Sequence, residues 1–380
     1  MTESGPTRLT QPEFVDVSSA RVSVVRQPCE PPFAIDWIKI SETVYIVCEL
    51  FAEDESGLGF CFTFDAEHAL PMANLMAQLT TKCFRSKPTP APSSVRATLR
   101  TMLSLTGYPG IGISCAAAIE TALWDLIVRA AKRDWSNYFG RVADRRYPAY
   151  VTCGSVSSSP YEVAVDVRSA FAQGYHLVKI KVGGDEKRDE LRLAAAHEAA
   201  GDGCRLLIDA NQTWTAKSAA RLLERWRRYD LVWVEEPLPA HDLAGLAWLR
   251  DRVDVPIATG ESYYDTATLA EIIERRAADV LTVNPQKVGG VSAFDSIVNA
   301  CNLACMAVTC HTFGEIAAPL LGNAVNVPAV EIVPWMHGAF SGGPVVVNGE
   351  LTANSGLGLG VSLAPEAKSR TIHQIDFDLQ

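Results

Sequence analysis

Seven short apolar segments in the second half of the chain end in residues that could do chemistry. Each segment is a run rich in Leu, Val, Ile or Ala, which is typical of a buried β-strand. The polar or charged residues at these strand ends are Lys179 and Lys181, Asp209 and Asn211, Glu235, Glu261, Asn284, His311, and Glu331. Barrel enzymes place their catalytic groups where the carboxyl ends of parallel strands meet. We therefore expect these side chains to converge on one site.

Three of these residues, Asp209, Glu235 and Glu261, are carboxylates that would repel one another on convergence. A divalent cation removes that repulsion, and a ligand set made only of oxygen favours Mg²⁺ or Mn²⁺ over Zn²⁺. Neighbouring residues of a strand point to opposite faces, so only one residue of the pair Glu235 and Glu236 is expected to bind the metal. We assign Glu235 as the ligand and expect a structural or outer contact for Glu236.

The elements that must position these residues follow a regular order. From about residue 149, short β-branched runs alternate with amphipathic stretches, and eight such units fit into about 190 residues. Nearly continuous apolar strands favour a (β/α)8-type barrel over an open doubly wound sheet. Before residue 140, strands precede helices, which predicts a separate α+β domain.

Composition excludes several classes of partner. The 380 residues are 48% hydrophobic, which is ample for a large core, and the formal net charge of −10 without a basic stripe argues against nucleic acid. There is no apolar run of about 18 residues and no signal peptide, so we expect a cytoplasmic protein without a membrane partner. Most of the ten cysteines lie in apolar strings, which indicates free buried thiols.

The motifs VKIKVGG, LLIDANQTW, WVEEP, TGES, KVGGVS and CHTF, in this order, resemble the enolase superfamily, in particular its mandelate racemase-like branch. The stretches AAAIETALWDL and SGLGLG extend the resemblance over nearly the whole chain. It implies a modified TIM barrel, (β/α)7β, with an N-terminal α+β capping domain. We expect the cap at residues 1–142, the barrel at 143–342, and a C-terminal segment, 343–380, that packs back on the cap. The resemblance also implies a homo-oligomer.

The same resemblance implies a reaction, the removal of the proton α to a substrate carboxylate. This chemistry uses Mg²⁺ to stabilise the developing enediolate. Lys181 would be the base on one face of the substrate, with its pKa lowered by the neighbouring charge of Lys179. His311 would be the acid or base on the other face. Glu331 would donate from a protonated carboxyl group to the substrate carboxylate, and Asn211 would contact a substrate hydroxyl.

Asn284 departs from the family pattern, which has an aspartate paired with the histidine at this place. An Asn oxygen could still accept from Nδ1–H of His311, but it cannot stabilise the imidazolium as a carboxylate does. If the amide instead turned its NH₂ group to the ring, His311 would hold the wrong tautomer for a base. The competence of His311 as a base therefore depends on the orientation of one amide.

Three functions are compatible with these residues. The first, which we favour here, is racemisation or epimerisation of an α-hydroxy acid by Lys181 and His311. The second is dehydration of a sugar acid, and the third is a metal-binding barrel with lost or altered catalysis. The expected cap loop RQPCEPPFAIDWIKI offers Pro, Phe, Ile and Trp, with Trp37 as a candidate for the pocket lining. This composition favours a small or partly apolar carboxylate substrate.

Overall fold

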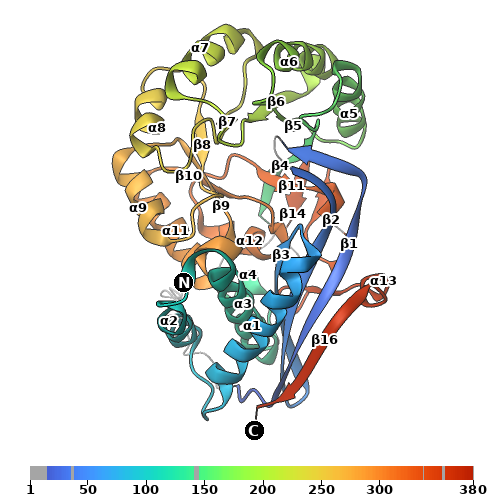
Figure 1. Cartoon of the computed structure of the whole chain (residues 1–380), viewed down its shortest axis with the longest axis vertical. Coiled ribbons are helices and arrows are strands. Elements are labelled where there is room, and N and C mark those ends of the chain that lie inside the picture. Colours follow the sequence, from blue (N-terminus) through green and yellow to red (C-terminus); the bar gives the residue numbers. More distant parts are fainter. Residues whose placement is uncertain (1–14, 36–37, 141–144, 337, 353–355, 380) are drawn as a thin grey trace, which may run out of the picture.

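The computed structural model describes residues 15–35, 38–140, 145–336, 338–352 and 356–379. A four-stranded antiparallel sheet and three long helices form the N-terminal part, and a parallel barrel follows it (Figure 1). The strands of the sheet lie in the order β16-β1-β2-β3. Their bounds are β1 Ser19–Ile35, β2 Ile38–Ala52, β3 Glu55–Thr63 and β16 Thr371–Asp378, and the helices are α1 Ala66–Phe84, α2 Pro92–Leu103 and α3 Ile113–Ala130.

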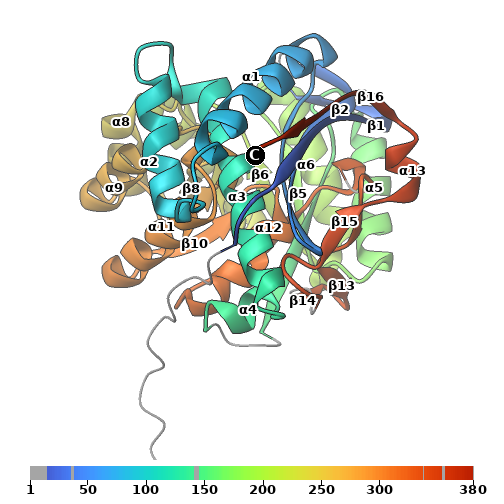
Figure 2. The ribbon, with the colours of Figure 1, turned by 90° about the horizontal axis from the view of Figure 1, so that it is seen from below.

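The last strand of the chain joins the first part of the fold. β16 pairs antiparallel with β1, with Ser19 opposite Asp378, and both strands lie side by side in two views (Figures 1 and 2). This pairing agrees with a C-terminal segment that packs back on the cap. The boundary that we predicted at residue 142 lies outside the described residues, so the domain limits stay predictions.

Both faces of the cap sheet are buried, which explains why β2 is apolar along most of its length. Val44 and Ile46 pack in a cluster with residues of α1 and α3, whereas Tyr45 and Val47 belong to the large cluster that contains the barrel core. Successive side chains of a strand alternate between its faces. The cap sheet is therefore fastened to its own helices on one face and to the barrel on the other.

Eight parallel strands form the barrel, and a helix lies in each of the seven connections between them, a stretch that is described throughout. The predicted (β/α)7β barrel with an α+β cap is confirmed. The strands are β4 Arg146–Cys153, β5 Leu177–Lys181, β6 Arg205–Asp209, β7 Val234–Glu235, β8 Ile257–Thr259, β9 Val280–Val283, β10 Ala307–Cys310 and β11 Val330–Ile332. The connecting helices are α5 Pro160–Ala172, α6 Glu186–Ala200, α7 Ala216–Trp226, α8 Leu243–Arg250, α9 Thr266–Arg275, α11 Val291–Ala304 and α12 Gly314–Leu320, with the short α10 Pro285–Val288 before α11.

An apolar layer inside the barrel lies below the polar strand ends. Its members form one buried cluster: Tyr150, Leu207, Trp233, Ala258, Val280, Ala307 and Ala329. Two residues further along their strands, Leu207 is followed by Asp209 and Trp233 by Glu235. Because side chains two apart share a face of a strand, the layer that fills the barrel also supports the carboxylates above it.

Helix α3 connects the cap to the barrel. It approaches β3 at Gly57 and Gly59, where an added Cβ would lie 2.2 Å from the carbonyl oxygen of Ala122 and 2.0 Å from that of Ala118, respectively. The stretch Tyr108–Ala130 has the length and hydropathy of a membrane span, but 89% of its most apolar window is buried inside the protein. Packing within the fold accounts for this apolar surface.

Buried Glu120 of α3 is bound to the barrel. Its carboxylate accepts from the backbone N–H of Val291 (2.8 Å) and of Ser292 (3.1 Å) at the start of α11, and from Nε1 of Trp124 (3.0 Å). The Ser292 hydroxyl also donates to this carboxylate. An anion at a helix N-terminus satisfies backbone donors that otherwise have no partner. Glu120 therefore links the cap to α11, the helix that follows Asn284 and the short helix α10.

Candidate active site

The three carboxylates that we predicted as metal ligands come together at the carboxyl ends of their strands. Asp209 ends β6, Glu235 ends β7, and Glu261 lies two residues beyond β8. One oxygen from each lies within 4.8 Å of the other two, and all three residues are buried. Oε1 of Glu235 has no hydrogen-bond partner in the described part of the chain. A buried carboxyl oxygen without a hydrogen-bond partner can serve as the ligand of a divalent cation, so the residues present fit the expected Mg²⁺.

The two lysines of β5 lie among these carboxylates. Nζ of Lys179 is 2.7 Å from Oε1 of Glu331, 2.9 Å from Oε2 of Glu235 and 3.5 Å from Oδ2 of Asp209. Nζ of Lys181 is 2.6 Å from the same Oδ2 of Asp209. Lys179 is fully buried and shared among three acids, while Lys181 lines the cavity described below. Their different surroundings favour a structural charge for Lys179 and a reactive amine for Lys181.

The predicted direction of the Lys181 pKa is wrong. Burial and the charge of Lys179 both lower this pKa, but Asp209 opposes them, and the pKa of Lys181 is raised above its ordinary value. The neighbouring lysine is visible in the sequence, whereas a carboxylate 2.6 Å away on the adjacent strand is not.

Glu331 is not the protonated donor that we expected. It accepts from Oγ1 of Thr152 (2.5 Å) and from the backbone N–H of Thr312 (3.0 Å), and it pairs with Lys179. Burial raises the pKa of Glu331, but the positive charge of Lys179 and the hydrogen bonds from Lys179 and Thr152 outweigh burial, so the net pKa is well below the ordinary value. In this arrangement Glu331 is a carboxylate that neutralises Lys179.

His311 and Asn284 meet across β9 and β10. Nδ2 of Asn284 lies 3.0 Å from Nδ1 of His311, and Oδ1 of Asn284 accepts from the backbone N–H of Gln286 (2.9 Å) as the N-cap of α10. Rotating the amide by half a turn would set its NH₂ group against the N–H of Gln286, two donors facing each other. The hydrogen-bond network therefore assigns the amide nitrogen to the ring.

This assignment places the proton of neutral His311 on Nε2, because Nδ1 must accept from Asn284. Nε2 lies 3.0 Å from Oε2 of Glu261 and 4.0 Å from Oε2 of Glu331. Burial lowers the pKa of His311 to about 4, so the ring is neutral at neutral pH. Of the two amide orientations that the sequence left open, the structure contains the one with the NH₂ group of Asn284 turned to the ring. His311 can therefore donate through Nε2 but has the wrong tautomer for a base.

Gln286 extends this network into the cap. Its side-chain Oε1 accepts from the backbone N–H of Phe62 (2.9 Å), and its Nε2 donates to the carbonyl of the same residue (3.2 Å). Phe62 belongs to β3 of the cap sheet. We did not identify Gln286 from the sequence, although the residue stands in the NPQKVGG stretch between Asn284 and the paired glycines.

Glu236 lines the same cavity as Glu261, rather than pointing away from it as a regular strand would require. Its φ of +40° is left-handed, so the strand ends at Glu235 and the chain turns. Nε2 of Gln212 lies 3.1 Å from the Glu236 carboxylate and 2.8 Å from Oγ of Ser262. Glu236 thus contacts the side chain of Gln212. We expected a structural or outer contact for Glu236, but not that its side chain would line the cavity.

A cavity of about 840 Å³ opens above these residues. Lys181, Asn211, Asn284, His311 and Glu331 line it. Oδ1 of Asn211 is buried without a hydrogen-bond partner in the described residues, which suits the predicted contact with a substrate hydroxyl. Trp37, our other candidate for this pocket, lies outside the described residues. The lining residues that we did not identify from the sequence include Gln212, Tyr264, Gln286, Lys287 and Trp335.

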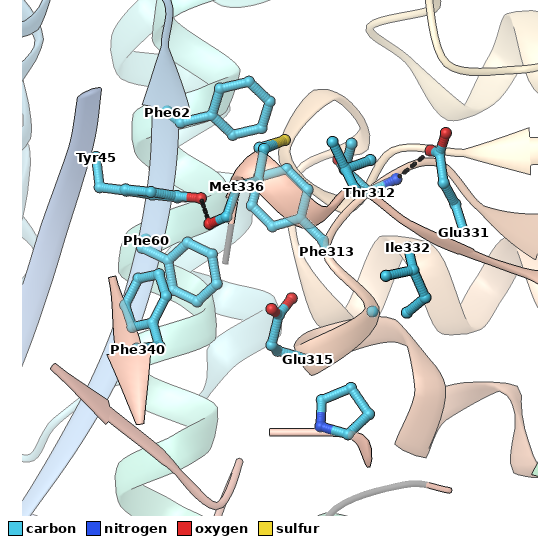
Figure 3. Close-up of a pocket in the computed structure, with 13 residues that line it drawn as sticks. Tyr45, Phe60, Phe62, Thr312, Phe313, Glu315, Glu331, Ile332, Met336 and Phe340 are labelled. Carbon is cyan, nitrogen blue, oxygen red and sulfur yellow. Dashed lines mark hydrogen bonds between the residues drawn. The ribbon is translucent and has the colours of Figure 1, made fainter. Parts of the chain in front are cut away.

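A smaller neighbouring pocket shows how the cap meets the barrel. The hydroxyl of Tyr45 in β2 donates to the carbonyl of Met336 (2.7 Å), and the Phe62 ring stacks on Phe313 with centroids 5.3 Å apart. Figure 3 shows Tyr45, Phe60 and Phe62 facing Phe313 and Met336 across this contact. The wall of the active-site cavity is therefore built jointly by the cap and the loops after β10 and β11.

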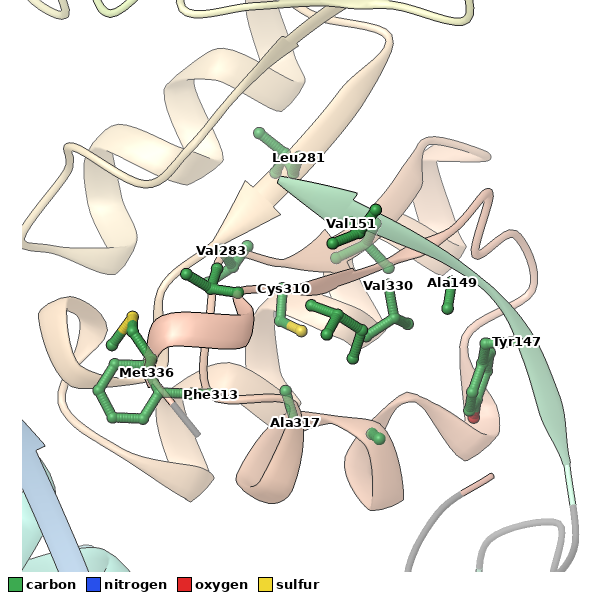
Figure 4. Close-up of a cluster of buried hydrophobic side chains, with 14 of the residues drawn as sticks. Tyr147, Ala149, Val151, Leu281, Val283, Cys310, Phe313, Ala317, Val330 and Met336 are labelled. Atoms are coloured by element: carbon green, nitrogen blue, oxygen red, sulfur yellow. The ribbon is translucent and has the colours of Figure 1, made fainter. Parts of the chain in front are cut away.

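Cys310 precedes His311 but does not form a Cys–His pair with it. Figure 4 shows Cys310 among Val283, Val330 and Ala317 in the buried apolar cluster. Burial raises the pKa of this thiol well above its ordinary value. A buried neutral thiol packs as an apolar side chain and is not a nucleophile.

A profile of the family described as Enolase C-terminal domain-like matches residues 162–367. This match covers more than half of the 380 residues. The chain belongs to this family. The Enolase C-terminal domain-like match extends from α5 to α13 (Pro365–Lys368) and so includes every candidate ligand and base.

Relatives within the same superfamily differ in reaction. The chain is 29% identical to L-talarate/galactarate dehydratase of Salmonella typhimurium over 70% of this chain and 67% of that protein. It is 32% identical to an L-Ala-D/L-Glu epimerase of Bacillus subtilis over 53% of this chain and 59% of that protein. The structure of L-talarate dehydratase from Polaromonas sp. JS666, complexed with Mg and L-glucarate, is 26% identical, with a TM-score of 0.84 over 95% of this chain and 99% of that one. These comparisons place the chain among enzymes of the superfamily.

Proposed function

We propose that this chain removes the α-proton of a small carboxylate substrate, with Lys181 as the base and Mg²⁺ as the cofactor. The observation that carries the proposal is the convergence of Asp209, Glu235 and Glu261 beside Lys181. Lys181 and Glu261 of this group line the cavity. Mg²⁺ on these three ligands would act as a Lewis acid toward the substrate carboxylate. The relatives named above, two dehydratases and an epimerase, support this reaction class.

Lys181 suits the role of base because its amine borders the cavity, whereas Lys179 is enclosed. Its raised pKa depends on Asp209, and a cation that shares the charge of Asp209 weakens this effect. Burial and Lys179 would then act on the amine with less opposition, and both favour its neutral form. The same two effects were the basis of the prediction from sequence.

His311 determines the fate of the substrate after proton removal. Its Nε2–H, set by Asn284, can donate a hydrogen bond to a leaving hydroxyl or to a substrate oxygen, but it cannot accept a proton. Elimination of a β-hydroxyl group needs one base for the α-proton, Lys181, and one donor that stabilises the departing hydroxide, the Nε2–H of His311. The hydroxide leaves to solvent, and the proton that Lys181 later releases to solvent balances it as water. The Asn284–His311 contact therefore supports dehydration of a hydroxy acid as the outcome.

Racemisation or epimerisation, the outcome that we favoured from sequence, is the second candidate. The relationship to the Bacillus subtilis epimerase supports it. It requires a base on both faces, so His311 would have to take the other tautomer and Asn284 would have to turn its oxygen to the ring. That rotation would cost the bond to the N–H of Gln286.

Proton NMR in D₂O with Mg²⁺ tests the proposal across a panel of α-hydroxy acids and sugar acids. We expect loss of the α-proton signal and a 2-keto-3-deoxy product with the wild type, and neither with Lys181→Ala. Lys217→Ala, an exposed lysine of α7, is the matched control. Exchange into both configurations without a new product would show the racemase. Mg²⁺ binding with no exchange for any acid would contradict the proposed reaction and indicate a barrel with altered catalysis.

The expected partners are part of this proposal. A small carboxylate is the substrate class that the named relatives share with our prediction. We further propose a cytoplasmic homo-oligomer that binds neither nucleic acid nor membrane. Light scattering of the purified chain, with a monomer as the contradicting result, tests the oligomer.

A further inference from the structure

The cavity has a charged floor and an apolar roof. Its ionisable lining residues all come from the barrel: Lys181, Glu236, Glu261, Lys287, His311 and Glu331. In the described part of the cap, the residues that line it are Phe33, Ile40, Phe62, Thr63 and Phe64. None of these cap residues carries a charge. A ligand held by its carboxylate at the floor therefore extends toward an apolar surface.

Aromatic contacts make this roof continuous between cap and barrel. The Phe33 ring, from β1, stacks on Trp335 with centroids 5.5 Å apart and planes 27° apart. Phe64 lies 6.0 Å from Trp335 and 5.2 Å from Phe62. Such tilted and stacked pairs hold the rings in fixed positions. We call this surface, made of Phe33, Phe62, Phe64 and Trp335, the aromatic roof.

The cap hairpin that carries Phe33 is pinned to the barrel. The backbone N–H of Ala34 donates to Oγ of Ser155 (3.0 Å), and the N–H of Val156 donates to the carbonyl of Ala34 (3.1 Å). Ser155 and Val156 lie just beyond the end of β4. The roof is thus preorganised, which lowers the entropic cost of holding a ligand against it.

Two of the polar side chains that line the barrel side of the cavity, Gln212 and Lys287, already have partners. Gln212 bonds Glu236, Ser262 and the backbone of Ala240. Nζ of Lys287 lies 5.4 Å from the ring centroid of Tyr264, a cation–π arrangement. A polyol chain under the roof would exchange hydrogen bonds to water for contact with aromatic carbon, whereas an apolar chain would gain from leaving water.

We infer that the substrate is a hydroxy carboxylate whose far end is apolar, of the size of an aromatic ring, and that the aromatic roof selects it. This inference rests on the proposed function, which places the carboxylate end at Asp209, Glu235 and Glu261. It narrows the substrate class from carboxylates in general to those with a carboxylate and its α- and β-hydroxyl groups at one end and a hydrocarbon group at the other.

Two hydroxamates with the same metal-chelating head and different tails test the inference by calorimetry with Mg²⁺. The probes are phenylacetohydroxamate and the hydroxamate of a four-carbon sugar acid. We expect the phenyl compound to bind the wild type roughly tenfold more tightly or better. Equal binding, or tighter binding of the sugar compound, would overturn the apolar substrate class while leaving the metal site in place. If neither bound in a Mg²⁺-dependent way, the proposed function would fail, and this inference with it.

Two roof variants locate the preference. Phe64→Gln and Trp335→Gln should each reduce the phenyl preference several-fold, with little effect on the sugar hydroxamate. Phe171→Gln, at a ring on α5 that is 44% exposed, is the matched control and should leave the preference unchanged. Circular dichroism shows whether each variant is folded. Because each variant tests the roof by itself, one folded variant is enough for the test if the other does not fold. An unchanged preference in a folded roof variant would refute the assignment of the roof.

Discussion

The amide nitrogen of Asn284 lies 3.0 Å from Nδ1 of His311, and the oxygen of the same amide caps helix α10 through the N–H of Gln286. One side chain thereby joins a structural task to a chemical one. An aspartate at this position could accept from both groups, because both of its oxygens are acceptors. An asparagine has one acceptor and one donor at these positions. Because its oxygen caps α10, only its NH₂ group is left for His311.

Asn284→Asp should convert His311 into a base. A carboxylate beside Nδ1 stabilises the imidazolium, so the pKa of His311 should rise above about 4. We expect α-proton exchange on the second face of the substrate, which NMR in D₂O can detect, and a higher histidine pKa by NMR titration. Asn299→Asp, exposed on α11, is the control. An unchanged histidine pKa in Asn284→Asp would show that the amide does not determine the state of His311.

Glu261→Gln should abolish the rise in melting temperature that Mg²⁺ produces. The substitution keeps the shape of the side chain but removes one of three anionic ligands, and Mg²⁺ prefers carboxylates. Without Mg²⁺, the variant should be no less stable than the wild type, because repulsion from Asp209 is removed. Thermal melts with Mg²⁺ and with chelator measure both effects. Glu198→Gln, exposed on α6, should behave as the wild type.

The stability of the chain without Mg²⁺ should fall as pH rises from about 4.5 to about 8. Burial raises the pKa of Glu236 to about 8 from the ordinary 4.5, so the folded chain keeps a proton that the unfolded chain has already lost. Each such group lowers the free energy of unfolding by about 1 kcal/mol per pH unit in this range. Urea titrations with chelator at several pH values measure the slope. Glu236→Gln should flatten it, and a slope that is the same in this variant would contradict the assignment.

Glu120→Ala should destabilise the protein by about 2–4 kcal/mol, because buried donors of Val291, Ser292 and Trp124 would lose their acceptor. Urea unfolding measures the loss. Glu271→Ala, a partly exposed acid of α9, should cost much less. A loss as small as that of the control would mean that Glu120 does not fasten the cap to α11.

The fold could be predicted because the strands of this barrel are short, apolar and regularly spaced. Asp209, Glu235 and Glu261 were recognisable as one group because each lies at or just beyond the end of such a strand, and parallel strand ends meet. The charge states of Lys181 and Glu331 could not be predicted in the same way. The charge of Lys181 depends on Asp209 at 2.6 Å and that of Glu331 on Lys179 at 2.7 Å, and no spacing along the chain reveals these distances between strands.

The aromatic roof and the orientation of the Asn284 amide could not be predicted from the sequence for a related reason. Trp335 and Phe64 are far apart in sequence, and neither stands at a strand end that a motif marks. The amide orientation depends on whether the N–H two residues later needs an acceptor, which is a property of α10, a helix of four residues too short for periodicity to predict.

The side chain of Gln286 forms hydrogen bonds with both the N–H and the carbonyl of Phe62. The backbone N–H of Gln286 donates to the side-chain oxygen of Asn284. The protonation of the imidazole is therefore coupled to the edge of the cap sheet through three consecutive contacts. A shift of β3 by one residue would remove the two contacts that hold the Gln286 side chain, next to the N–H that orients the Asn284 amide. In this architecture, a substitution in the cap sheet can therefore reach the surroundings of His311 without any change among the barrel residues.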